Sequence, residues 1–214
     1  MMQQSKKVRY IIVLFLLGVS VVALVGWNIC VGTVRIPLTD IFASIRGEKI
    51  ENSRILWDIR MPRTLAAMIL GGALALAGYL LQTFFHNPIA GPFVLGISSG
   101  AKMVVALIMV FLMGQAVKIT SWALIAAAFV GAMISMGFVL LMSRRVHNMS
   151  MLVVSGVMIG YICSAITELV VTFASDAEIV NLHNWSRGSF SGMTWENVAV
   201  MTGVVAVSYT HLTL

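Results

Sequence analysis

The sequence is dominated by apolar stretches that are long enough to cross a lipid bilayer as helices. The hydrocarbon core of a bilayer is about 30 Å thick, and an α-helix needs roughly 20 residues to cross it. The chain has five complete stretches of this kind: Tyr10–Ile29, Thr64–Phe84, Phe93–Met113, Ile119–Met142 and Met151–Phe173. A sixth stretch begins near Trp195. Only 10% of the residues are charged, whereas soluble domains carry about 25%. We therefore predict an all-α, polytopic transmembrane helical bundle with five complete spans and part of a sixth.

Composition and motifs exclude several classes of function. The basic residues are scattered between apolar stretches and form no single patch, so we expect no nucleic acid partner. The chain has no G-x-x-x-x-G-K-[ST] sequence, which excludes ATP binding through such a loop. The sequence contains no cluster of histidines and cysteines that would indicate a metal site. We also expect no cofactor. Cys30 and Cys163 lie in or beside apolar stretches, and we interpret them as core residues.

Two polar connections between the spans contain amphipathic segments. In the first connection, apolar residues recur at i, i+3, i+4 and i+7, which predicts a short helix on the membrane surface or on the protein: Leu38, Ile41, Phe42 and Ile45. Thr39 is the candidate cap of this helix and Gly47 its candidate end. A second amphipathic segment is expected within Ala174–Thr194.

The second predicted span carries a face of small residues and ends in a polar turn. Small side chains on this face let another helix approach closely within lipid: Gly71, Ala75 and Gly78. The pair Asn87-Pro88 predicts a turn, because proline cannot continue a regular helix. Gln82, His86 and Asn87 place polar groups at this membrane boundary, where a pore or gate lining and a solvated turn fit equally well.

A serine motif and a single acid occur inside the apolar stretches. Residues 96–100 (GISSG) match the G-x-S-x-G nucleophile pattern. This pattern opens a membrane helix here instead of following a strand, so close packing explains it better than catalysis by Ser98. Glu168 is the one acid within an apolar stretch. A substrate contact or proton relay and solvation at the interface both remain open for it.

Two arginines, Arg60 and Arg63, stand at the start of the second span. They are either ordinary interfacial anchors or an exposed pair for an acidic partner, since a guanidinium binds a carboxylate in a bidentate manner.

The orientation of the chain in the membrane is also open. If the N-terminus is cytoplasmic, the outer side carries more basic residues than the inner side, whereas membrane proteins usually have more lysine and arginine on the cytoplasmic side. The basic N-terminal tail, however, favours a cytoplasmic N-terminus.

Taken together and in order, these motifs resemble the FecCD-like family of ABC-importer permease subunits, whose cargoes are iron-siderophores, haem and cobalamin. The resemblance covers the chain from about Leu38 to Val200. It is carried by the following residues: RMPR (60–63), GGALA (71–75), Gln82, NPIA (87–90), Pro92, LGISSGA (95–101), SGV (155–157), Trp185, Gly188 and Trp195.

The resemblance implies a ten-helix permease in the plasma membrane of a bacterium, with a cytoplasmic N-terminus. It implies four partners besides membrane lipid: a second permease subunit, two cytoplasmic ATPase subunits and an extracytoplasmic substrate-binding protein. The family's arginines at the positions of Arg60 and Arg63 face outward and dock acidic residues of the binding protein. The turn and re-entry after the second span would lie near the translocation pathway. We assign tentative pathway or gate residues accordingly: Gln82, Asn87, Pro88, Ser98, Ser99 and Glu168.

We therefore predict a permease subunit of an ATP-driven importer that performs no chemistry on its cargo. An iron-siderophore is the first candidate cargo, with haem and cobalamin open. The alternatives are an ion-coupled secondary transporter that uses Glu168 and an intramembrane hydrolase that uses Ser98. We expect residues 1–207 to form the N-terminal part of the permease domain. Residues 208–214 (SYTHLTL) leave the apolar pattern and are interpreted as a tail of doubtful origin on a truncated chain.

Overall fold

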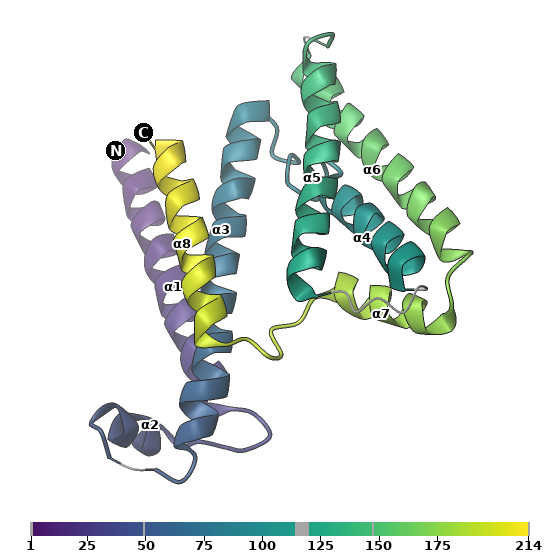
Figure 1. The fold of residues 1–214 in the computed structure, drawn as a ribbon. Helices are drawn as coiled ribbons and strands as arrows, with labels where there is room; N and C mark the ends of the chain where they lie inside the picture. The colour runs from purple at the N-terminus through teal and green to yellow at the C-terminus, as the bar shows by residue number, and fades with distance from the viewer. Residues whose placement is uncertain (1, 49, 114–119, 147, 214) are drawn as a thin grey trace. The chain divides into compact units, whose positions relative to one another are not determined.

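The computed structural model describes residues 2–48, 50–113, 120–146 and 148–213. Most of the chain within these ranges is helical and none of it forms a strand, which confirms the predicted all-α class (Figure 1). The helices in chain order are α1 (Met2–Cys30), α2 (Leu38–Ile45), the π-helix η1 (Ile55–Arg60), α3 (Met61–Phe85), α4 (Ile97–Met113), α5 (Ser121–Ser143), α6 (Met149–Val171), α7 (Asp176–Arg187) and α8 (Trp195–Thr213).

Four helical segments of the described chain are long and apolar enough to cross a membrane: Lys6–Cys30, Ile55–Phe85, Ser121–Ser143 and Met149–Val171. The apolar part of α4, Ile97–Phe111, is shorter than these four. The predicted helical membrane bundle is confirmed, whereas the predicted number of spans stays a prediction. The predicted start of the fourth span at Ile119 lies outside the described residues.

The predicted start of the third span at Phe93 is wrong, because α4 begins only at Ile97. Residues 92–96 form turns instead. Gly96 has a φ of +72°, a left-handed conformation that interrupts a helix and that residues with a Cβ atom rarely adopt. The sixth segment, by contrast, begins at Trp195 as predicted.

The contacts of the chain divide it into two compact units. One, called here the terminal unit, comprises Met1–Gly72 and Phe190–Leu214. The other, called the central unit, comprises Ala73–Ser189. The single permease domain expected over residues 1–207 stays a prediction, and α8 continues through residue 208 to Thr213.

The central unit is organised around α4. This helix packs against α5, α6 and α7, and α5 also contacts α6. Figure 1 shows α4 between α5 and α6, with α7 crossing near one end of the three. The buried side chains fall on narrow stripes. On α5 they recur every four residues: Ala127, Gly131, Ser135 and Val139. A stripe of this kind buries one face of a helix and leaves the other for lipid.

The terminal unit has a smaller core around Ile29, Ile36 and Leu56. Helix α2 forms where the amphipathic pattern predicts it, and Gly47 follows its end with a φ of +86°. The predicted cap at Thr39 is wrong, because Pro37 occupies the N-cap position and no side chain caps the helix. The Trp57 indole donates a hydrogen bond of 2.8 Å to the Ser44 hydroxyl, which ties α2 to η1.

Candidate functional site

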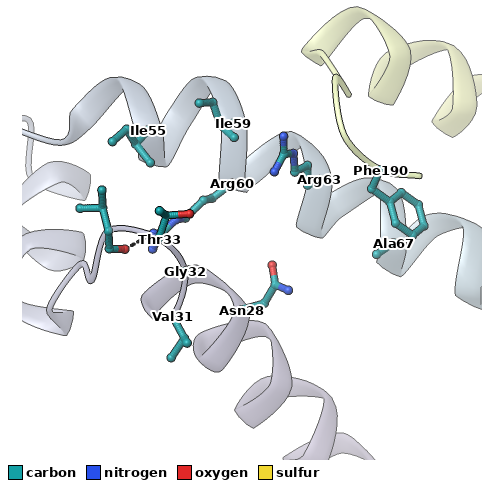
Figure 2. Close-up of a pocket in the computed structure, with 11 residues that line it drawn as sticks. Asn28, Val31, Gly32, Thr33, Ile55, Ile59, Arg60, Arg63, Ala67 and Phe190 are labelled. Carbon is teal, nitrogen blue, oxygen red and sulfur yellow. Dashed lines mark hydrogen bonds between the residues drawn. The ribbon is translucent and has the colours of Figure 1, made fainter. Parts of the chain in front are cut away.

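A cavity of about 520 Å³ lies in the terminal unit where α1 ends and α3 begins. Its lining combines polar and apolar groups from α1, the loop after α1, η1, α3 and residue 190 (Figure 2): Asn28, Val31, Gly32, Thr33, Val34, Ile55, Ile59, Arg60, Arg63, Ala67 and Phe190. Both arginines of the predicted docking pair therefore line one cavity, but the structure gives them different surroundings.

Arg60 is buried, with only 8% of its surface exposed. Its Nη1 donates a hydrogen bond to the carbonyl oxygen of Ile29 in the last turn of α1. Its Nη2 donates to the carbonyl oxygen of Val34 in the following loop. A buried charge is expensive unless hydrogen bonds replace its water. The Ile29 carbonyl at the C-terminus of α1 provides one of them, because such carbonyls have no partner within the helix and carry its negative partial charge. The loop carbonyl of Val34 provides the other.

The surroundings of Arg60 are fitted to its guanidinium. A Cβ atom at Gly32 would lie 2.7 Å from Arg60 Nη2, so the side chain occupies the space that only a glycine leaves open. The Thr64 hydroxyl lies 2.8 Å from the Arg60 carbonyl oxygen and 2.8 Å from Asn28 Oδ1. Figure 2 shows the Arg60 side chain directed toward the loop at Gly32 and Thr33.

Arg63 lies about one turn further along and is half-buried. Its Nε is buried and has no hydrogen-bond partner among the described residues. A buried donor left without an acceptor costs roughly 1–3 kcal/mol. Arg63 thus contributes a half-buried guanidinium to the cavity lining, while Arg60 is already engaged by the backbone.

The predicted Asn-Pro turn is present after α3. The Asn87 side chain accepts a hydrogen bond of 2.9 Å from the backbone N–H of Ile89, and the Asn87 N–H donates to the Gln82 carbonyl at 3.1 Å. Asn87 is half-buried, whereas the Gln82 and Pro88 side chains are exposed. Asn87 thus closes the turn by bonding to its own backbone neighbourhood.

The other predicted pathway residues lie on α4 and α6 and are only partly brought together. Ser99 lies 3.5 Å from the hydroxyl of Ser164. These two serines line a shallow depression of about 290 Å³ together with Tyr161. Ser98 and Glu168 are exposed. Their roles in a pathway stay predictions.

The small-residue face predicted on α3 is open. Gly71 and Ala75 are exposed, and a Cβ atom at Gly71 or Gly78 would meet no heavy atom of the described residues within 4 Å. Close backbone contacts lie elsewhere, at α4 and the turn before it. Two of the glycines there, Gly96 and Gly100, belong to the GISSG segment that we attributed to close packing, and three were not singled out: Gly131, Gly156 and Gly160. The spacing Gly156-x-x-x-Gly160 is a sequence signal that could have identified one of these contacts.

Comparison with known proteins places this geometry in context. The sequence profile of the FecCD transport family matches residues 12–214. The vitamin B12 import system permease protein BtuC of Citrobacter koseri is 37% identical over 206 residues, which cover 96% of this chain and 59% of that protein. The protein of the same name in Shigella boydii is 36% identical over 205 residues, with the same shares of both chains. The chain thus spans about three-fifths of the length of the curated relatives it matches.

A solved structure supports the fold independently. It is assigned to the metal-chelate type of ABC transporter and is in an inward-facing conformation. The likeness has a TM-score of 0.75 and covers 94% of this chain and 60% of that one. At 22% sequence identity, the likeness concerns the fold alone.

Proposed function

The chain belongs to the FecCD transport family, and from this premise we propose that it forms part of a permease subunit through which an ATP-driven importer moves a metal chelate across a membrane. The observation that carries the proposal is the match to permease proteins along 96% of the chain at 37% identity. The helices long enough to span a membrane agree with this role. We propose no enzymatic activity for the chain, and ATP hydrolysis would take place on separate subunits.

For the cargo, we propose a corrinoid ahead of an iron-siderophore or haem. The relatives from Citrobacter koseri and Shigella boydii are named for vitamin B12 import. This order reverses the one suggested by the family resemblance alone, in which an iron-siderophore came first.

The working assembly would contain a second permease subunit, two cytoplasmic ATPase subunits and an extracytoplasmic binding protein. It would lie in a bacterial plasma membrane with the N-terminus of the permease in the cytoplasm. In that orientation the cavity with Arg63 opens on the outer side, where the binding protein arrives. The half-buried Arg63 guanidinium that lines this cavity suits a carboxylate of that protein.

Two other functions receive less support. An ion-coupled transporter would use Glu168, but this side chain is exposed on α6 and is not enclosed among groups that could relay a proton. A hydrolase would use Ser98, but its hydroxyl has no hydrogen-bond partner in the described part of the chain. A general base within hydrogen-bond reach is needed to activate a serine.

Uptake in proteoliposomes tests the proposal. The full-length permease would be reconstituted with its ATPase and binding protein, and uptake of labelled cyanocobalamin, a ferric siderophore and haem would be compared. We expect cyanocobalamin uptake that requires ATP and persists when a protonophore collapses the proton gradient. Glu168→Gln should leave this uptake largely intact, because no step of the proposed mechanism needs the carboxylate. Uptake that is independent of ATP and lost in Glu168→Gln would contradict the importer, and uptake of the siderophore alone would contradict the corrinoid.

A further inference from the structure

A groove of about 570 Å³ lies on the exposed face of α5, a helix that is long and apolar enough to cross a membrane. Gly137 is two residues from both Ser135 and Val139, which belong to the buried stripe of α5. Two residues turn an α-helix by about 200°, so the groove lies opposite the face that packs within the central unit. Five apolar side chains and one arginine line it together with Gly137: Met133, Ile134, Phe138, Leu140, Leu141 and Arg144.

Gly137 forms a hollow in this groove. Residues three and four positions away are its neighbours on the surface of a helix. All four of these neighbours are apolar and more than half exposed: Met133, Ile134, Leu140 and Leu141. A Cβ atom at Gly137 would meet no heavy atom of the described residues within 4 Å. The glycine therefore leaves a space between bulky apolar side chains.

The shape of this space favours a lipid acyl chain over another helix. Close contact between membrane helices is favoured by several small residues along one face. Gly137 is the only small residue among those that line the groove. An acyl chain is narrow and flexible, and it can lie between side chains that hold a second helix backbone away. The apolar residues thus predict contact with lipid, but they do not select a type of lipid.

Arg144 supplies the selection, because it lines the groove where α5 ends. It follows Gly137 by seven residues, which corresponds to about 10 Å along a helix. Arg144 and its neighbour Arg145 are both exposed, and neither side chain bonds to another described residue. The groove therefore has an apolar part within the span and a free positive charge at its polar end.

The acids of the central unit lie far from this charge. Glu168 follows Met149, the first residue of α6, by 19 residues, or roughly 28 Å along the helix. The other acids belong to α7, which follows the distant end of α6: Asp176 and Glu178. The arginine end of the groove is thus free to attract an anion from outside the central unit.

We propose that the groove binds an anionic phospholipid, with an acyl chain in the hollow at Gly137 and the headgroup phosphate at the Arg144 guanidinium. A guanidinium binds phosphate oxygens in a bidentate manner, and basic residues at a membrane boundary attract anionic lipids. Arg145 does not line the groove and contributes only general attraction. In the orientation of the proposed function this end of α5 is cytoplasmic, but the site itself does not depend on that orientation.

Fluorescence quenching by brominated lipids tests the site in the full-length permease, reconstituted in bilayers. Leu141→Trp places a fluorophore in the groove at an exposed position. Its emission is the difference from the same protein with leucine at this position. Dibrominated phosphatidylglycerol and dibrominated phosphatidylcholine carry the same quencher and differ in headgroup charge. We expect the anionic lipid to bind about fivefold more tightly at this position. Equal binding of the two lipids would overturn the proposal.

Two arginine variants separate a site from general surface attraction. Arg144→Gln, made together with Leu141→Trp, should bring the two lipids to within about twofold of equal binding. Arg145→Gln is the matched control, because it removes the same charge one residue away and outside the groove. It should retain at least about half of the preference. An equal loss in the two variants would mean that no specific site exists.

Gly137→Leu tests the hollow without a change of charge. The leucine has room in the described part of the chain, so the helix should form as before. It should exclude the acyl chain and reduce both the quenching of the introduced tryptophan and the preference for the anionic lipid. Wild-type quenching and preference in this variant would refute the hollow as the acyl site.

The same measurement identifies other occupants of the groove. If neither lipid quenches the introduced tryptophan, another helix of the permease covers this face, and the proposal is wrong. The experiment requires no ATPase, binding protein or cargo. A failure of the proposed transport function would therefore leave the lipid result unchanged.

Discussion

Single glycines hold the helices of the central unit at backbone contact distance. A Cβ atom at Gly100 on α4 would lie 2.0 Å from Ser135 Oγ and 2.5 Å from the Gly131 carbonyl oxygen on α5. The contact between α6 and the turn before α4 has the same character, because a Cβ atom at Gly156 would lie 2.9 Å from Leu95 Cα. A side chain can rotate away from such a clash, but a backbone atom moves only with its whole helix.

Gly100→Ala tests this packing. Alanine favours a helix over glycine by up to about 1 kcal/mol, but the clash with α5 should reverse the sign and destabilise the fold by roughly 1–3 kcal/mol. The measurement is the melting temperature of the purified chain in detergent. Gly137→Ala on α5 is the matched control, because its Cβ atom would meet no atom of the described part of the chain within 4 Å. A melting temperature in Gly100→Ala equal to that of Gly137→Ala would mean that α4 and α5 are not in close contact.

The arginines and the glycines show what residue patterns can and cannot predict. The sequence placed Arg60 and Arg63 at one site, and both do line the cavity. It did not separate their surroundings, because the burial of Arg60 depends on carbonyls 26 and 31 residues away. Small residues likewise indicate that another helix can approach that face of a helix closely. They do not by themselves reveal which face has a neighbour within the chain: α3 and α6 both carry small residues four apart, Gly71 and Ala75 on α3 and Gly156 and Gly160 on α6, but only those of α6 meet a neighbour among the described residues.

At the level of whole elements, helix ends are the features that the sequence predicted most directly. Asn87-Pro88 ends α3 and Gly47 follows α2, because both signals act through the local backbone. The start of α4 was missed by four residues, since apolar residues 93–96 continue the hydrophobic pattern without being helical. Their turn depends on Gly96, which has a φ of +72° and whose Cα would lie 3.2 Å from a Cβ atom at Gly160 on α6.

Helix α7 has a capping box that can be tested at its N-terminus. Glu178 Oε2 accepts a hydrogen bond of 2.8 Å from the Ser175 N–H, and the Ser175 side chain accepts one from the N–H of Glu178. Ser175→Ala should cost about 1 kcal/mol, which corresponds to roughly fivefold faster amide exchange in the first turn. Hydrogen–deuterium exchange of residues 176–179 measures this effect.

Ser186→Ala is the control for α7, because this hydroxyl donates to the His183 carbonyl near the other end of the helix and caps nothing at the N-terminus. If the amide hydrogens of residues 176–179 exchange at the same rate in Ser175→Ala and Ser186→Ala, the capping box does not stabilise the N-terminus of α7.

At the scale of the whole molecule, the small-residue face of α3 is the surface that we expect another helix to cover. Glycine weakens a helix by roughly 1 kcal/mol compared with alanine, and a lipid-facing glycine gains nothing in return. Gly71 and Gly72 are both exposed and have open space around them. Small residues are favoured in membrane helices where a second backbone comes close. The chain covers 59% of the length of its relative from Citrobacter koseri. We therefore expect a helix from outside this chain to cover the face.

Gly71→Leu separates packing within this chain from packing in the assembly. The leucine has room in the chain itself, so the melting temperature of the 214-residue chain should not fall. In the full-length permease the same leucine should hold the covering helix away and lower the yield of assembled complex in size-exclusion chromatography. Gly18→Leu on α1 is the control, since Gly18 is also exposed with open space but lacks small residues on both sides. Wild-type assembly in Gly71→Leu would mean that lipid covers this face, and its glycines would then need another explanation.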